Sequence, residues 1–246
     1  MAAEPEVVVE ADADQLAANT AARARVTLAA AVQARGVAHL VITGGSILEA
    51  VLAAMAEPTD LDWSRVHVWW GDERYVAADS DDRNERPARA KLLDHVPVAA
   101  DHVHPMPPSD AGFDSVEDAA AAYAADLTAL ATDGDVPHFD VVLLGIGPDG
   151  HCASLFPGHP GPRVSDRAVI AVHDSPKPPP TRISLTFPAL DAAEEIWVVA
   201  SGDGKAEAVA RALGGADRVE VPSAGPRGRR RTLWLVDAAA ASQLPN

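Results

Sequence analysis

Short apolar runs recur along the chain, and most are followed by a segment with helical spacing. This alternation predicts βα units arranged around a mostly parallel sheet. Most of the runs are apolar throughout, which indicates a sheet that helices cover on both faces. The predicted strands are residues 7–10, 38–43, 65–70, 139–145, 168–174, 195–201 and 232–237, and the predicted helices are residues 12–35, 46–56, 84–94, 115–131 and 204–213.

Length and composition narrow the class of protein. A chain of 246 residues without a long Gly/Ser linker is expected to form one α/β domain over residues 1–246. Its formal net charge of −16 repels phosphate backbones and acidic membranes, so neither nucleic acid nor a membrane is an expected partner. One cysteine excludes an internal disulfide and a multi-cysteine zinc site, and the acidic N-terminal segment does not read as a secretory signal. We therefore expect a cytoplasmic protein.

Four irregular stretches contain most of the residues suited to chemistry. They are TGGS, GDERY, GPDGHCASLFPGHPGP and DSPKPPPTR, and three of them directly follow a predicted strand. In open parallel α/β sheets, ligands bind at the carboxyl edge of the strands. The sequence therefore predicts a binding site built from these stretches.

The first two stretches have a functional and a structural interpretation. Gly44 and Gly45 allow close backbone approach, and Ser46 opens a helix whose free N–H groups suit an anionic phosphate. A tight turn capped by Ser46 explains the same pattern equally well. Asp72 and Arg74 end an apolar strand, where they form either a solvated loop or the wall of a cleft.

The stretch GIGPDGHCASLFPG is the most specific indication of a catalytic site in the sequence. Its glycines surround Asp149 and His151, and a histidine titrates near neutral pH, so His151 is a candidate general base that Asp149 orients. An ordinary loop histidine is the competing interpretation. The sequence gives less support for a metal site, because only His102 and His104 are spaced as metal ligands could be.

Cations stand out against the acidic background. Lys177 and Arg182 lie in a loop stiffened by prolines, and Lys205 lies at the start of a helix, where a cation is disfavoured unless an anion lies nearby. These three residues are candidates for phosphate binding, although Lys177 alone could be a solvated surface residue. The basic run at 227–231 is interpreted as a solvated loop without a role in the site.

Taken together, the motifs resemble one family. TGGS, WWGDERYV, Asn84 within DDRNERPARAKLL, FDVVLLGIGPDGHCASLFPGH, SPKPPPTRISLT and SGDGKAEAV occur in the order found in 6-phosphogluconolactonases. The resemblance implies a Rossmann-like layered α/β fold, shared with glucosamine-6-phosphate deaminases and ribose-5-phosphate isomerases. It also implies hydrolysis of 6-phospho-D-glucono-1,5-lactone to 6-phosphogluconate in the pentose phosphate pathway, without a metal or an organic cofactor.

The same resemblance assigns roles to residues. It implies that His151 is the general base, that Asp149 and Arg74 line the catalytic site, and that Lys177 reaches the substrate or a closing loop. The implied substrate and phosphate contacts are Gly44, Gly45, Ser46, Asp72, Lys177, Arg182 and Lys205. Two departures occur: GGSIL replaces the common GGSTP, which removes a hydroxyl, and Cys152 replaces a common Thr or Ile.

Two other functions fit part of the pattern. An aminosugar-phosphate deaminase would carry a glutamate seven residues after Asp149, where this chain has Phe156, and a tyrosine where it has Arg74. A sugar-phosphate sensor without enzymatic activity would normally carry a DNA-binding module, and the sequence shows none. We therefore expect a phosphorylated sugar lactone as the partner. No pattern sets the oligomeric state, although a monomer is favoured.

Overall fold

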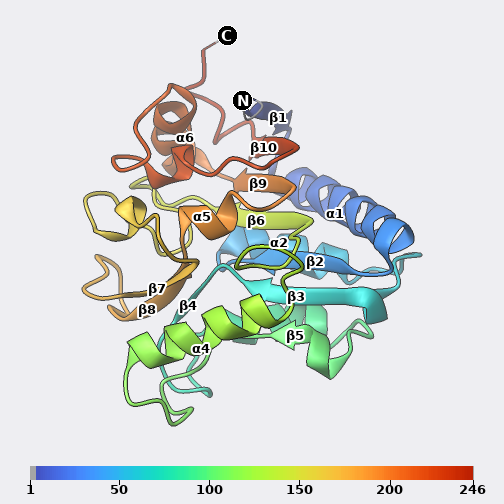
Figure 1. Cartoon of the computed structure of the whole chain (residues 1–246). Helices are drawn as coiled ribbons and strands as arrows, with labels where there is room; N and C mark the ends of the chain where they lie inside the picture. The colour runs from blue at the N-terminus through green and yellow to red at the C-terminus, as the bar shows by residue number, and fades with distance from the viewer. Residues whose placement is uncertain (1–3, 246) are drawn as a thin grey trace.

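A central parallel sheet organises the chain. The computed structural model describes residues 4–245, so the predicted domain limits at residues 1 and 246 lie outside the described part. The seven strands run in the order β1-β10-β9-β6-β2-β3-β5, from top to bottom in Figure 1. Every neighbouring pair is parallel. Their bounds are Glu6–Glu10 (β1), Ala38–Ile42 (β2), Val66–Trp70 (β3), Val103–His104 (β5), Val141–Gly145 (β6), Glu195–Ala200 (β9) and Arg231–Asp237 (β10). The predicted fold class is confirmed.

A second, antiparallel sheet lies beside the first. It contains β4 (Asp72–Arg74), β8 (Arg182–Leu185) and β7 (Val169–Val172), in that order. The strand predicted at 168–174 therefore exists but does not join the parallel sheet. A loop without a helix connects β7 to β8, so the two strands pair antiparallel. β4 and β8 have three and four residues, too few for a clear hydrophobic period.

The helices agree with the predicted ones in most places. Their bounds are Ala13–Arg35 (α1), Ser46–Met55 (α2), Glu85–Ala88 (α3), Val116–Ala129 (α4), Phe187–Leu190 (α5) and Ala206–Leu213 (α6). The helix predicted at 84–94 is split, since α3 continues as a π-helical turn over Arg89–Leu93. Within residues 4–245, no helix is both long and apolar enough to cross a membrane.

Local chemistry sets the ends of the longer helices. The Asp12 carboxylate accepts the N–H of Gln15 at 2.8 Å at the start of α1. Gly36 ends the same helix with a φ of 79°, a left-handed conformation that glycine adopts without strain. Ser115 begins α4, where its hydroxyl accepts the N–H of Asp118 and donates to that residue's carboxylate.

The helices cover the two faces of the central sheet. α1 packs against α2 on one face, whereas α4 lies in front of the sheet in Figure 1. The Tyr123 hydroxyl of α4 bonds both backbone groups of Trp70 in β3. Trp69, Trp70, Trp197 and Trp234 are fully buried and fill the space between the layers. This apolar sandwich holds the strand ends rigidly in place.

The carboxyl ends of four adjacent strands meet at one edge. β9, β6, β2 and β3 lie side by side and point the same way. Each is followed by one of the segments that the sequence marks as unusual: SGDGK, GIGPDGH, TGGS and GDER. The topology therefore brings together the stretches at 43–46 and 201–205, which lie far apart in the sequence.

Candidate active site

The glycine turn after β2 forms one wall of a cleft of about 490 Å³. Gly45 has a φ of 130°, which few other residues adopt, and α2 begins directly after it. A Cβ on Gly44 would lie 2.1 Å from the side-chain oxygen of Asn84. Glycine is therefore required at both positions, and the first turn of α2 lines the cleft, where its free N–H groups suit an anion.

The Asp149–His151 pair follows β6. His151 Nδ1 lies 2.5 Å from Asp149 Oδ1, and the His151 side chain remains 17% exposed. Gly147 makes room for the pair, because a Cβ there would lie 1.9 Å from His151 Nδ1. A carboxylate that accepts from Nδ1 leaves Nε2 of neutral His151 as the proton acceptor. The pair therefore has the geometry of an oriented general base.

Charge around this pair keeps Asp149 ionised. Burial alone would raise the pKa of Asp149, but the hydrogen bond and charge of His151 and the charge of Lys177 hold it well below its usual range. Lys177 Nζ lies 3.5 Å from Asp149 Oδ1 and 3.3 Å from His151 Nδ1. The ring of His151 lies against buried Phe156, at 4.7 Å between centroids.

Arg182 holds the proline-rich loop that contains Lys177. Its Nη2 donates to the carbonyls of Lys177 at 3.0 Å and Pro178 at 3.1 Å, and its Nε donates to that of Pro179 at 3.2 Å. The predicted role of Arg182 is direct phosphate contact. The structure adds a second one, since most of its donors are used to place Lys177 beside Asp149.

The short antiparallel sheet supplies the opposite wall. Asp72 is 4% exposed and accepts the Ser154 hydroxyl at 2.7 Å. Arg74 Nη1 donates to the carbonyl of Asp82 at 2.7 Å, whereas its Nε is buried without a partner among the described residues. A buried donor without a partner is costly, although other atoms of Arg74 line the cleft.

Lys205 completes the positive side of the cleft from the segment after β9. Burial lowers the pKa of Lys205, and the neighbouring charge of Lys177 lowers it further. An anion bound between Lys177 and Lys205 would offset the repulsion between these two cations. The cleft thus gathers positive charge in an otherwise acidic chain.

The structure brings nearly all predicted site residues together. The cleft is lined by Gly44, Gly45, Ser46, Asp72, Arg74, His151, Lys177, Arg182 and Lys205. Asp149 touches His151 and Lys177 from beside the cleft. The sequence patterns assign no site role to Asn84, which also lines the cleft. Its only local signal is a position before a helix, where an asparagine reads as an ordinary cap.

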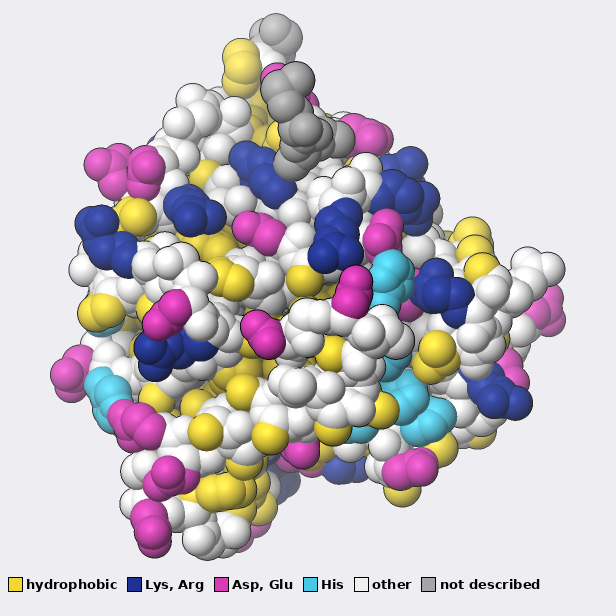
Figure 2. Space-filling view, in the orientation of Figure 1, with side chains coloured by type: hydrophobic (Ala, Val, Ile, Leu, Met, Phe, Trp, Pro, Cys, Tyr) yellow, Lys and Arg dark blue, Asp and Glu magenta, His cyan; other side chains and the backbone are white. Residues whose placement is uncertain are grey.

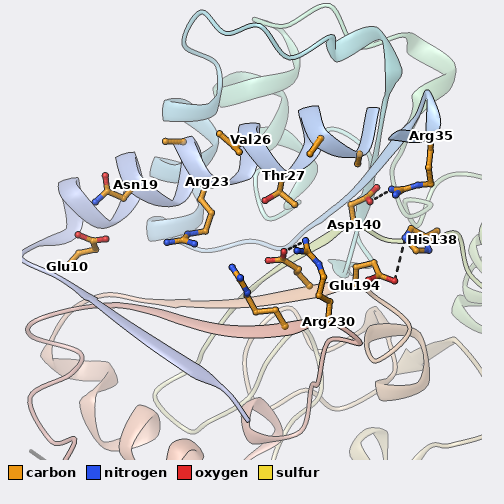
Figure 3. Close-up of a pocket in the computed structure, with 15 residues that line it drawn as sticks. Glu10, Asn19, Arg23, Val26, Thr27, Arg35, His138, Asp140, Glu194 and Arg230 are labelled. Carbon is orange, nitrogen blue, oxygen red and sulfur yellow. Dashed lines mark hydrogen bonds and ion pairs between the residues drawn. The ribbon is translucent and has the colours of Figure 1, made fainter. Parts of the chain in front are cut away.

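A larger cleft of about 940 Å³ lies beside α1 and the first residues of β9 and β10 (Figure 3). Its charged lining is balanced: Arg23, Arg35, Arg230 and Arg231 against Glu10, Asp140, Glu194 and Glu195. Arg35 pairs with Asp140 and Arg230 with Glu195. The smaller cleft instead carries four cations and only Asp14 and Asp72 as acids. An anionic ligand is therefore favoured in the smaller cleft.

The histidines considered as metal ligands form a stack. His67 Nδ1 lies 2.9 Å from His104 Nε2, and His102 stacks on His67 at 3.8 Å between centroids. Burial lowers the pKa of His67 and His104 to about 4. Across residues 4–245, no three His, Cys, Asp or Glu side chains are grouped to hold a metal ion.

Figure 2 shows how basic side chains are distributed on one face of the molecule. On the face shown in Figure 2, Lys and Arg side chains lie apart and are interspersed with Asp and Glu. This face has no continuous basic surface of the kind that phosphate backbones require.

A strand edge rich in cations, a helix-start glycine turn and an oriented histidine lie together at one end of this α/β fold. A family model described as glucosamine-6-phosphate isomerases/6-phosphogluconolactonase matches residues 11–234, and the chain belongs to this family. The predicted resemblance to 6-phosphogluconolactonases is confirmed. The chain is 51% identical to the 6-phosphogluconolactonase of Streptomyces coelicolor, with 98% of this chain and 95% of that protein covered. It is 52% identical to that of Mycobacterium tuberculosis, with 96% of each chain covered.

Solved structures agree with this placement. The 6-phosphogluconolactonase of Trypanosoma brucei matches with a TM-score of 0.84 at 28% identity, covering 98% of this chain and 99% of that one. The Thermotoga maritima enzyme matches with a TM-score of 0.83 at 26% identity, covering 95% and 100%. A monomeric glucosamine-6-phosphate deaminase shares the fold, with a TM-score of 0.80 at 20% identity over 96% and 99% of the two chains.

Proposed function

We propose that the protein hydrolyses 6-phospho-D-glucono-1,5-lactone to 6-phospho-D-gluconate with a water molecule that His151 activates. The observation that carries the proposal is the Asp149–His151 pair, which lies at a cleft with four cations and a helix start. Relatives about 50% identical over nearly the whole chain bear the name 6-phosphogluconolactonase, which supports this substrate.

Binding begins with the phosphate. The N–H groups at the start of α2 and the cations Arg182 and Lys205 attract the dianion, and Lys177 adds charge near the histidine. Fixing the phosphate places the lactone carbonyl at the other end of the sugar, beside His151. Orientation of this kind lowers the barrier by replacing a bimolecular encounter.

Hydrolysis then needs one base and one anion-stabilising group. His151 Nε2 takes a proton from water while the oxygen attacks C1, and the carbonyl oxygen becomes an oxyanion. The guanidinium of Arg74, which lines the cleft, is a donor for that oxyanion. When the C1–O5 bond breaks, the imidazolium returns its proton to the ring oxygen. Asp149 stabilises the imidazolium between these steps.

The deaminase alternative needs a group that moves protons during ring opening and isomerisation. At the corresponding position Phe156 is buried against His151 and has no exchangeable proton. Hydrolysis of a lactone needs no such group. The residue at this position therefore favours the lactonase over the deaminase.

One assay separates the two activities. Freshly generated 6-phosphogluconolactone is supplied with 6-phosphogluconate dehydrogenase as the coupling enzyme, and the rate is corrected for spontaneous opening. Glucosamine 6-phosphate is tested in parallel for ammonia release. We expect turnover of the lactone only. Ammonia release without lactone turnover would refute the proposal.

A further inference from the structure

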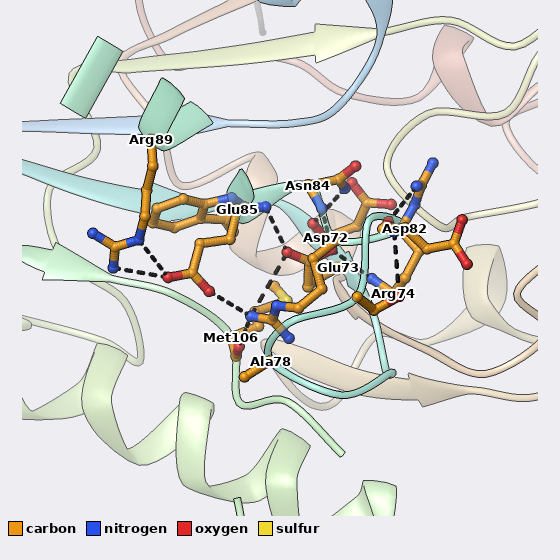
Figure 4. A network of polar contacts seen from close by, with 12 residues as sticks. Asp72, Glu73, Arg74, Ala78, Asp82, Asn84, Glu85, Arg89 and Met106 are labelled. Atoms are coloured by element: carbon orange, nitrogen blue, oxygen red, sulfur yellow. Dashed lines mark hydrogen bonds and ion pairs between the residues drawn. The ribbon is translucent and has the colours of Figure 1, made fainter. Parts of the chain in front are cut away.

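A buried carboxylate outside the cleft joins its two walls. Glu73 is 1% exposed and accepts three backbone N–H groups: from Arg74 at 2.7 Å, from Asn84 at 2.7 Å and from Glu85 at 2.9 Å (Figure 4). The first bond fixes β4, and the other two fix the start of α3. Arg83 Nη2 lies 3.8 Å from Glu73 Oε2, and its charge only partly offsets the burial that raises the pKa of Glu73 to about 7.

Asn84 connects Glu73 to the cleft. Its backbone is held by Glu73, and its side-chain Nδ2 donates to the carbonyl of Asp72 at 3.1 Å. Its Oδ1 packs so closely on Gly44 that a Cβ there would lie 2.1 Å away. The Asn84 side chain is thus wedged between β4 and the glycine turn.

The position of both walls therefore depends on one carboxylate. Replacing one carboxylate oxygen of Glu73 by an amide NH2 leaves at least one of the three N–H groups that it holds without an acceptor in a buried place. A shift of Asn84 would then release the glycine turn from β4. Misplacement of a binding group by about 1 Å is enough to cost roughly 10²-fold in rate.

We propose that Glu73 is a positioning residue for phosphate capture, acting through Asn84 on the turn at 43–46. The inference rests on the proposed function for its substrate. Glu73 itself does not line the cleft. A purely structural role would lower stability and the amount of folded protein, but would leave the KM of that folded protein unchanged.

Glu85 provides a matched control. Its carboxylate belongs to the same network, bonding Arg83 at 2.8 Å and Arg89 at 2.8 Å. It makes no bond to the Asn84 side chain or to Arg74, and it does not line the cleft. Glu85→Gln therefore perturbs the same ion-pair cluster without touching the proposed link.

The experiment measures kcat and KM for 6-phosphogluconolactone in the wild type, Glu73→Gln, Asn84→Ala, the double variant and Glu85→Gln. We expect KM to rise about tenfold in Glu73→Gln with a smaller change in kcat, and a similar rise in Asn84→Ala. The double variant should be no worse than the poorer single variant, because the two residues act through one link. Glu85→Gln should keep the wild-type KM.

Binding of 6-phosphogluconate, measured by calorimetry on the same proteins, separates this inference from the proposed function. If the wild type fails to open the lactone, the proposed function falls, and the affinities still decide whether Glu73 positions the turn. An unchanged KM and affinity in Glu73→Gln, multiplicative effects in the double variant, or an equal effect in Glu85→Gln would overturn the inference. Glu73→Asp, with a shorter reach, replaces Glu73→Gln if the latter does not fold. Failure of both to fold would assign Glu73 a structural role instead.

Discussion

Arg74 and Arg182 lie directly opposite each other on the antiparallel strands β4 and β8. Two like charges directly opposite each other destabilise a sheet unless a negative charge lies close to them. Burial lowers the pKa of Arg182, nearby Asp72 opposes that shift, and Arg74 adds to it. A bound anion would offset this repulsion, so we predict that ligand binding stabilises the short sheet.

Replacing one of the two arginines tests their part in phosphate capture. Arg182→Met should raise KM for 6-phosphogluconolactone about tenfold to a hundredfold, because charge-assisted hydrogen bonds contribute about 1.5–3 kcal/mol. The variant also frees the carbonyls of the loop that contains Lys177. Unphosphorylated gluconolactone should be a poor substrate for both proteins. Equal treatment of the two lactones by wild type and variant would show that Arg182 does not take part in phosphate capture.

Thermal unfolding with added phosphate gives a second test. Ligands that bind only the folded state add about 2.7 kcal/mol at a hundredfold excess over Kd. Inorganic phosphate should therefore raise the Tm of the wild type, and the rise should shrink in Arg74→Gln. Sodium chloride at matched ionic strength is the control, since a general salt effect would raise both proteins alike.

His151 should dominate the chemical step. His151→Ala should lower kcat by about 10²–10⁴-fold, the usual size of a general-base contribution. Asp149→Asn should lower kcat less, because the amide can still contact Nδ1 but cannot stabilise the imidazolium. Circular dichroism should show both variants folded. Near-normal turnover in His151→Ala would exclude this residue from the mechanism.

Gly147 offers a test of geometry without a change of charge. Gly147→Ala should lower kcat by roughly 10²-fold, because the added Cβ would collide with the Asp149–His151 pair. Gly204→Ala is the matched control, since a Cβ there meets nothing within 4 Å. Similar activities in the two variants would contradict the tight fit around His151.

The histidine stack predicts a loss of stability in acid. His39 belongs to the same stack, since its ring lies 4.8 Å from that of His67 between centroids. Burial lowers the pKa of His39 to about 3 and that of His67 to about 4, so the folded state binds fewer protons than the unfolded state below pH 6.5. The free energy of unfolding should therefore fall as pH drops from 6.5 to 4, by at most about 1.4 kcal/mol per pH unit for each proton. Urea titrations should show a shallower fall in His67→Gln. A pH-independent difference between the two proteins would argue against this origin.

The sequence predicts the central sheet well, because its buried parallel strands are continuous apolar runs. It assigns the strand at 168–174 to the wrong sheet, since pairing depends on the connection after the strand and not on the strand's own pattern. The sequence does not predict β4, β5 and β8, because strands of two to four residues are too short to show a hydrophobic period.

The candidate site is predicted largely by its glycines and cations at strand ends. The links between these segments are not predictable in the same way. The contact of Asn84 with Gly44 joins residues 40 positions apart, and the bonds from Arg182 to Lys177 and Pro178 depend on a loop conformation that no period encodes. Such contacts exist only once the layers have packed.

Arg182 donates hydrogen bonds to the carbonyls of Lys177, Pro178 and Pro179, so the proline-rich segment is ordered without a bound sugar phosphate. The loop is therefore preorganised, and a dianion does not have to order it on binding. Little conformational entropy is lost at the encounter, so more of the attraction between opposite charges is retained as affinity.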